Sequence, residues 1–188
     1  MKLPSTIKGW FNPKSHPDKL LQQFAATNNR KYLAALVGEY NQTLFHYLLS
    51  QSDKATAEDV LQITWLKVIN KKHLYRTNNS AKYWLFAIAR NTLIDELRKQ
   101  QKWCYQVLEE SHIMSVELTV QLDFEQQLNK FNAIINNLPF HQKEAFIFQQ
   151  EGFSLREIAE LTDENQETVK SRLRYARQYL KMHLENKT

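Results

Sequence analysis

The fold is decided by two consecutive stretches near the end of the chain, SLREIAEL at residues 154–161 and NQETVKSRLRYAR at residues 165–177. Ser154 and Glu157 have the spacing of a capping box, in which a hydroxyl and a carboxylate each satisfy a free backbone N–H of the first helical turn. A helix is therefore predicted to begin at Ser154. It should end within about two turns, because residues 162–165 are polar and prone to turns.

The second helix is predicted to carry an apolar and a basic stripe side by side. Asn165 is a suitable N-cap, and Glu167 places negative charge at the positive end of the helix dipole. The two stripes have the same spacing and are displaced by one residue, which is about 100° around the helix. The apolar stripe comprises Val169, Leu173, Ala176 and Leu180, and the basic stripe comprises Lys170, Arg174, Arg177 and Lys181.

A short helix, a tight turn and a second helix with these two stripes are what a helix-turn-helix DNA reader requires, because the second helix must pack and still face a DNA groove. The plainer interpretation is a surface helix pair with a solvated basic face. A basic stripe alone favours that interpretation. The capping box, the turn length and the double stripe together favour the DNA reader.

The composition indicates an almost wholly helical chain with an anionic partner. The 188 residues include only 3 Gly and 4 Pro, and 43% of them are hydrophobic, which is enough to build cores. The formal net charge of +5 modestly favours an anionic partner. Cys104 is the only cysteine, so no disulfide framework is expected and a reducing cytoplasm is the simplest location. We find no apolar run that suggests a signal peptide or membrane insertion.

The order of patterns along the chain predicts an all-α protein of two small helical domains joined by a linker, the second containing the helix-turn-helix. A proline-rich arm, 1–17, precedes a first domain over 18–102. In that domain Thr56 and Asp59 are predicted to form a capping box that starts a helix, and an apolar segment beginning at Tyr83 is expected to be the centre of the core. An acidic stretch, 103–124, is the predicted linker, and 125–188 form the second domain.

With both motif blocks in this order, the chain resembles the extracytoplasmic-function (ECF) sigma factors, compact promoter-specificity subunits of bacterial RNA polymerase in the sigma-70 family. The segment AEDVLQITWLKV at residues 57–68 is similar to the family's polymerase-docking helix. The segment YWLFAIARNTLID at residues 83–95 is similar to its promoter-melting segment. Leu138-Pro139 and residues 152–181 are similar to its reader of the upstream promoter element.

The resemblance implies a role for three groups of residues. The upstream minus-thirty-five element would be read by the second helix of the helix-turn-helix, with Arg172 and Arg177 on phosphates: the group is Lys170, Ser171, Arg172, Arg174, Tyr175 and Arg177. The melted minus-ten element would be bound by the first domain, through Arg76, Asn78, Asn79, Arg90 and Asn91. Core RNA polymerase would contact Glu58, Asp59 and Gln62.

The sequence departs from the family pattern at three positions. Ile63 stands where an acidic residue is common, Asp163 stands at a turn position where glycine is common, and Tyr175 replaces a frequent arginine. Asp tolerates the left-handed backbone better than most residues, so the turn is expected to survive. The promoter sequence read at Tyr175 is expected to differ from the commonest one.

The implied partners are core RNA polymerase and promoter DNA, and two domains on a linker would also suit clamping by an anti-sigma factor. The alternative function is a stand-alone helix-turn-helix regulator that binds duplex DNA without polymerase. An enzyme is disfavoured: the histidines have no metal-ligand spacing, and there is no glycine-rich phosphate loop. We therefore expect no catalytic residue, no metal and no cofactor.

Overall fold

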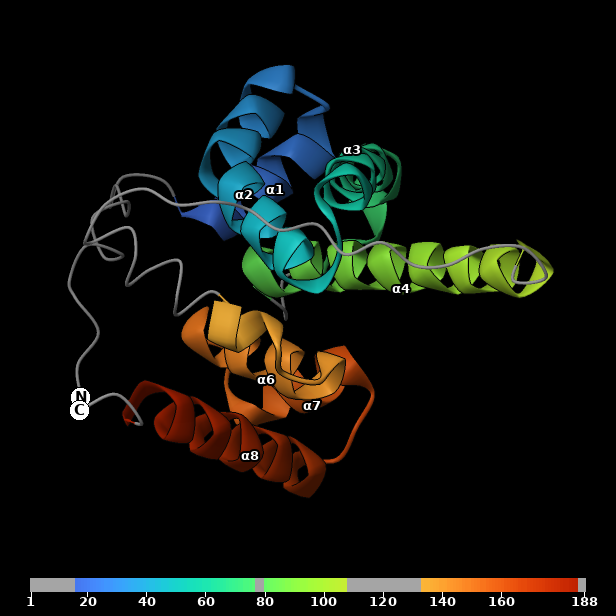
Figure 1. Cartoon of the computed structure of the whole chain (residues 1–188). Coiled ribbons are helices and arrows are strands. Elements are labelled where there is room, and N and C mark those ends of the chain that lie inside the picture. Colours follow the sequence, from blue (N-terminus) through green and yellow to red (C-terminus); the bar gives the residue numbers. More distant parts are fainter. Residues whose placement is uncertain (1–15, 77–79, 108–132, 186–188) are drawn as a thin grey trace, which may run out of the picture.

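The computed structural model describes residues 16–76, 80–107 and 133–185, and these residues form helices with no strand among them. Figure 1 shows α4 lying between the other helices of a first bundle, α1 to α3, and a second bundle, α6 to α8. The all-α prediction is confirmed. The helices are α1 Pro17–Thr27, α2 Arg30–Gln51, α3 Lys54–Lys71, the short 3-10 helix η2 Lys72–Leu74, α4 Ala81–Val107, α6 Phe140–Gln150, α7 Leu155–Thr162 and α8 Gln166–Glu185.

The predicted start of α3 is wrong by one turn. Asp53, and not Thr56, is the N-cap: its carboxylate accepts hydrogen bonds from the backbone N–H of Thr56 at 3.0 Å and from the Thr56 hydroxyl at 2.7 Å. Thr56 is thereby drawn inside the first turn, and Asp59 lies exposed on the helix surface. The helix therefore begins one turn before the predicted Thr56–Asp59 capping box, and the backbone N–H of Thr56, which would donate to the Asp59 carboxylate in that box, is bound by Asp53 instead.

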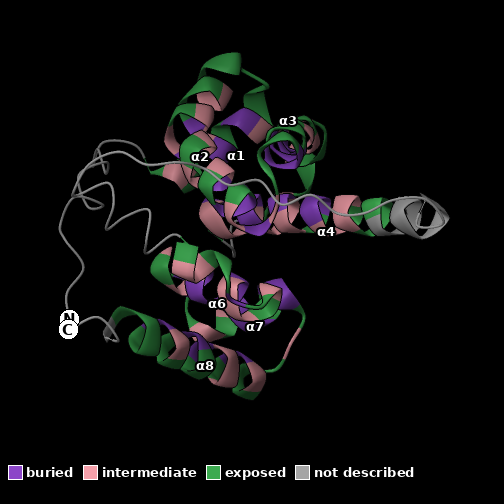
Figure 2. Cartoon of the chain, viewed as in Figure 1, coloured by how far each residue is buried: buried purple, intermediate pink, exposed green. Residues whose placement is uncertain are grey.

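The first bundle is held by a continuous apolar core in which α4 is central. Leu85, Phe86, Ala89 and Leu93 of α4 are fully buried, and Figure 2 shows buried residues on α4 where it passes α2 and α3. The apolar start of this helix is thus the core centre that the sequence predicts. The helix continues to Val107, so residues 103–107 of the predicted linker are helical, and residues 108–124 lie outside the described residues.

The second bundle follows the sequence prediction closely. Ser154 and Glu157 form both hydrogen bonds of the capping box, and Asn165 caps α8 by accepting from the backbone N–H of Thr168 at 2.7 Å. Asp163 ends α7 in the left-handed conformation, with φ of 55°. The whole apolar stripe of α8 is buried, from Val169 to Leu180.

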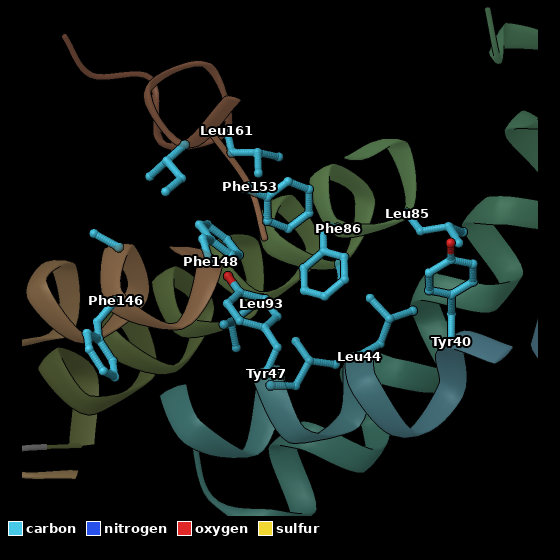
Figure 3. Packing of buried hydrophobic residues seen from close by; sticks show 14 of the residues in the cluster. Tyr40, Leu44, Tyr47, Leu85, Phe86, Leu93, Phe146, Phe148, Phe153 and Leu161 are labelled. Carbon is cyan, nitrogen blue, oxygen red and sulfur yellow. The ribbon is translucent and has the colours of Figure 1, made fainter. Parts of the chain in front are cut away.

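The two bundles pack directly against each other. α6 contacts α2, and α7 contacts α4. Four aromatic side chains meet where they join, and Figure 3 shows them pointing toward one another: Tyr47 of α2, Phe86 of α4, Phe148 of α6, and Phe153 between α6 and α7. All four are buried, so the cores of the two bundles are continuous across this contact.

Candidate nucleic-acid interface

The second helix of the helix-turn-helix presents a cationic surface to solvent. Lys170, Arg174 and Arg177 are exposed, while the apolar stripe beside them is buried. Tyr175 is 50% exposed, and the Arg174 guanidinium lies over its ring, 5.1 Å from the centroid. This surface combines positive charge with a planar aromatic group, which suits contact with phosphates and base edges.

Two of these cations have weak local partners. Lys170 pairs with Glu167 at 2.6 Å, three residues before it on the same helix, and Arg177 donates to the amide oxygen of Gln149 at 2.7 Å. Both Lys170 and Glu167 are exposed, so their ion pair contributes little and is easily exchanged for a phosphate. These side chains are therefore available to an anionic ligand.

Arg172 differs from its neighbours because it is bound within the protein. Its guanidinium donates to the Glu164 carboxylate, and the two side chains are only 17% and 31% exposed. Glu164 belongs to the turn between α7 and α8, so the pair ties that turn to α8. Six residues are expected at the minus-thirty-five element, and four of them are exposed. Ser171 is half-buried, and Arg172 is bound to Glu164 within the protein.

The residues expected at the minus-ten element are less uniform. Arg76 and Asn91 are exposed. Asn78 and Asn79 lie outside the described residues. Arg90 is directed into the contact between the bundles, where its side chain is 11% exposed. The sequence pattern gives no indication of this partner, because Arg90 and Glu144 are 54 residues apart.

Glu144 is the partner of Arg90, and its side chain is fully buried. The Arg90 guanidinium donates to both carboxylate oxygens, from Nε at 2.9 Å and from Nη2 at 3.2 Å. The Tyr47 hydroxyl donates to the same carboxylate at 3.0 Å. Burial first, and then the nearby Glu144 carboxylate, raise the pKa of Tyr47 well above its usual value. Tyr47 therefore remains a neutral hydrogen-bond donor.

A second candidate surface lies on the outer face of α3. Glu58, Asp59 and Gln62 are exposed there, and Glu58 makes only a long pair of 3.9 Å with Lys54. Leu66, one turn further along, is 59% exposed, and sequence reasoning missed it. The signal available in the sequence was its spacing, because Leu66 comes four residues after Gln62 and therefore lies on the same face of the helix.

Two further properties of the described residues concern metal ligands and the apolar character of the helices. Within residues 16–76, 80–107 and 133–185 no three His, Cys, Asp or Glu side chains gather as metal ligands would. In the same ranges none of the helices combines the length and the apolar character that crossing a bilayer requires.

Comparison with known proteins assigns both bundles to one class of protein. Residues 36–103 match sigma-70 region 2, and residues 128–180 match sigma-70 region 4. The chain thus belongs to the sigma-70 family of RNA polymerase sigma factors, within its ECF group. It is a promoter-specificity subunit that binds core RNA polymerase and directs transcription initiation at promoter DNA.

The relatives and solved structures agree with this assignment. The ECF RNA polymerase sigma factor SigX of Bacillus subtilis is 28% identical over 162 residues, which cover 80% of this chain and 82% of SigX. The sigma factor RpoE of Bartonella quintana, solved with the anti-sigma factor NepR, is 28% identical with a TM-score of 0.69 over 84% of this chain and 99% of RpoE. CnrH, solved with the cytosolic domain of CnrY, shares the fold with a TM-score of 0.67 and 18% sequence identity. The match covers 93% of this chain and 100% of CnrH.

Proposed function

We propose that the exposed surface of α8 reads the minus-thirty-five element through Lys170, Ser171, Arg174 and Tyr175, with Arg177 on the phosphate backbone. The observation that carries this proposal is the exposed basic stripe beside a buried apolar stripe on a capped helix. Arginine forms bidentate contacts with guanine, and exposed lysine and arginine side chains neutralise phosphates. Arg172 contributes indirectly, because its ion pair with Glu164 fixes the turn that precedes α8.

We further propose that the first domain, 18–102, binds the melted minus-ten element, and that a linker joins it to the second domain, 125–188. Arg76, Asn78 and Asn79 would receive a flipped base, whose extrusion costs a few kcal/mol that stacking and hydrogen bonds must recover. Asn91 is exposed for contact with the same strand. Arg90 joins this set once its guanidinium leaves Glu144.

Core RNA polymerase is proposed to dock on the outer face of α3. Polar contacts would come from Glu58, Asp59 and Gln62. Leu66, one turn closer to the C-terminal end of α3, would add an apolar contact. The polymerase provides the catalysis, so the chain itself is proposed to be non-enzymatic and to act in the cytoplasm. The complex of RpoE with NepR supports the further proposal that an anti-sigma factor binds this chain.

Run-off transcription with purified core polymerase tests the function. The chain should redirect core enzyme to specific promoters, and in gel shifts it should bind duplex DNA poorly until core enzyme is added. Tight specific binding without polymerase would instead support a stand-alone regulator. Asp59→Ala should weaken binding to core enzyme with an unchanged circular dichroism spectrum, because Asp59 is exposed and outside the core. An unfolded variant would contradict this placement.

A further inference from the structure

A short cationic turn leads from α3 toward α4. Residues 71–76 read KKHLYR and contain no acidic side chain. Lys71, His73 and Arg76 are exposed, and neither Lys71 nor Arg76 forms an ion pair within residues 16–76, 80–107 and 133–185. Exposed cations without a counter-charge are free to neutralise phosphates. This turn therefore offers phosphate contacts immediately before the segment proposed to receive the flipped base.

Leu74 lies in the middle of this turn and is 57% exposed. A single exposed leucine is ordinary on a protein surface. Leu74 differs because the turn around it is anchored. On one side, the Lys72 ammonium lies 5.2 Å from the centroid of the Phe24 ring and donates to the backbone carbonyl of Ile69 at 3.1 Å. The start of η2 is thereby fixed to α1 and to the end of α3.

Tyr75 anchors the other side of Leu74. Its ring is half-buried and packs edge-on against Trp84 with 5.6 Å between centroids, and its hydroxyl donates to Asp18 at 3.3 Å. Its backbone N–H donates to the carbonyl of Lys72 at 3.2 Å, which closes the turn. Burial first, and then the Asp18 carboxylate, raise the pKa of Tyr75 to about 12, so its hydroxyl stays a donor. Leu74 is therefore held in solvent between two anchored neighbours.

This arrangement has the properties of a side chain that separates stacked bases. Proteins that kink or open duplex DNA insert an apolar side chain between two base steps. Such a side chain must be exposed and held in place before DNA arrives, because ordering it on binding would cost free energy. Leu74 meets both conditions and has cations on either side of it. Tyr75 and Trp84 fit less well, because their rings are half-buried against each other.

We propose that Leu74 is the wedge that starts promoter melting: it enters the duplex at the minus-ten element, while Lys71 and Arg76 hold the phosphates on either side. This inference rests on the proposed binding of the minus-ten element by the first domain. Extruding a base costs stacking energy, and an apolar side chain that packs on the exposed base faces recovers part of it. Since separated strands have no stack to break, the contribution of Leu74 is confined to the opening step.

Opening rates on two forms of one promoter test this role. The holoenzyme, assembled from core polymerase and the full chain, is given a duplex promoter and a premelted promoter whose minus-ten strands are mismatched. A fluorescent adenine analogue in the minus-ten element reports strand opening. Leu74→Asn nearly keeps the size of the side chain and makes it polar. It should slow opening of the duplex roughly tenfold and leave affinity for the premelted promoter within about twofold.

Two further variants keep this result specific. Leu74→Met remains apolar and should open the duplex at close to the wild-type rate. Leu49→Asn is the matched control, because Leu49 of α2 is another exposed leucine of the first bundle, 39% exposed, and it should change neither measurement. Circular dichroism should show all three variants folded. A wild-type opening rate with Leu74→Asn, or an equal loss on the duplex and premelted promoters, would overturn the wedge.

Arg76→Ala separates this inference from the proposed function. It should weaken binding to the premelted promoter as well as to the duplex, because Arg76 is proposed to contact the melted strand. If Arg76→Ala acts in this way while Leu74→Asn opens the duplex normally, the wedge is wrong and the proposed function stands. If base changes in the minus-ten element leave wild-type binding to the premelted promoter unchanged, the proposed function fails, and the position assigned to Leu74 fails with it.

Discussion

The carboxylate of Asp18 in α1 accepts a hydrogen bond from the backbone N–H of Ala81, the first residue of α4. The same oxygen accepts from the hydroxyl of Tyr75 at 3.3 Å, so one side chain binds both ends of the segment that links η2 to α4. Ser80 adds a local cap by accepting from the backbone N–H of Tyr83 at 3.1 Å. The residues expected to receive a flipped base, Arg76 among them, belong to this segment.

Asp18→Ala should therefore lower both stability and promoter melting. The change removes a charged acceptor at a helix N-terminus, which is worth about 1–2 kcal/mol of unfolding free energy. Urea unfolding followed by circular dichroism measures this loss. Asp18→Asn keeps an acceptor oxygen and should retain most of the stability. Equal losses in the two variants would show that the hydrogen bond to Ala81 is unimportant.

Asp53 should make the stability of α3 depend on pH. Hydrogen bonds from the backbone N–H and hydroxyl of Thr56 hold the pKa of Asp53 below its ordinary value of 3.8. Its stabilising contribution is thus fully present above about pH 5, and it is lost as the pH falls past 3.8 and through the lower folded-state pKa. Asp53→Asn, a neutral cap, should lack this dependence. Urea unfolding of both proteins from neutral pH to about pH 3 measures it, and parallel curves would contradict it.

Local patterns predicted the second bundle because its determinants lie within a few residues of one another. The Ser154 capping box and the alternation of buried and exposed positions on α8 are set by spacing along one helix. The predicted start of α3 was wrong because Asp53 and Thr56 are both residue types that cap helices, three residues apart, and spacing alone does not rank them. The contact of Arg90 with Glu144 could not be predicted from the sequence, because periodicity shows which face of a helix is buried but not which residues pack against it.

Asp163 offers a test of backbone strain at the end of α7. Its φ of 55° lies in the left-handed region, which most side chains adopt only at a cost of about 1–2 kcal/mol. Asp163→Gly should raise the free energy of unfolding by up to about 1 kcal/mol, whereas Asp163→Val should lower it by about 1–2 kcal/mol. Thermal unfolding of the two variants measures the difference. A glycine variant less stable than the valine variant would show that the Asp163 conformation is not strained.

Arg172 and Arg174 form a matched pair for separating folding from promoter reading. They are two residues apart on α8, but Arg172 is bound to Glu164 and Arg174 is exposed. Arg172→Ala should lower the unfolding free energy by about 1 kcal/mol while promoter preference is kept.

Arg174→Ala should leave stability unchanged and reduce discrimination between cognate and base-substituted minus-thirty-five elements by about 1–3 kcal/mol, the value of a bidentate base contact. Run-off transcription on both promoters, with core polymerase in excess, measures this. An equal loss on every promoter sequence would show that Arg174 contacts only phosphate. A loss of base preference with Arg172→Ala, at a temperature where that variant is folded, would place Arg172 at the DNA and contradict its assignment to the turn.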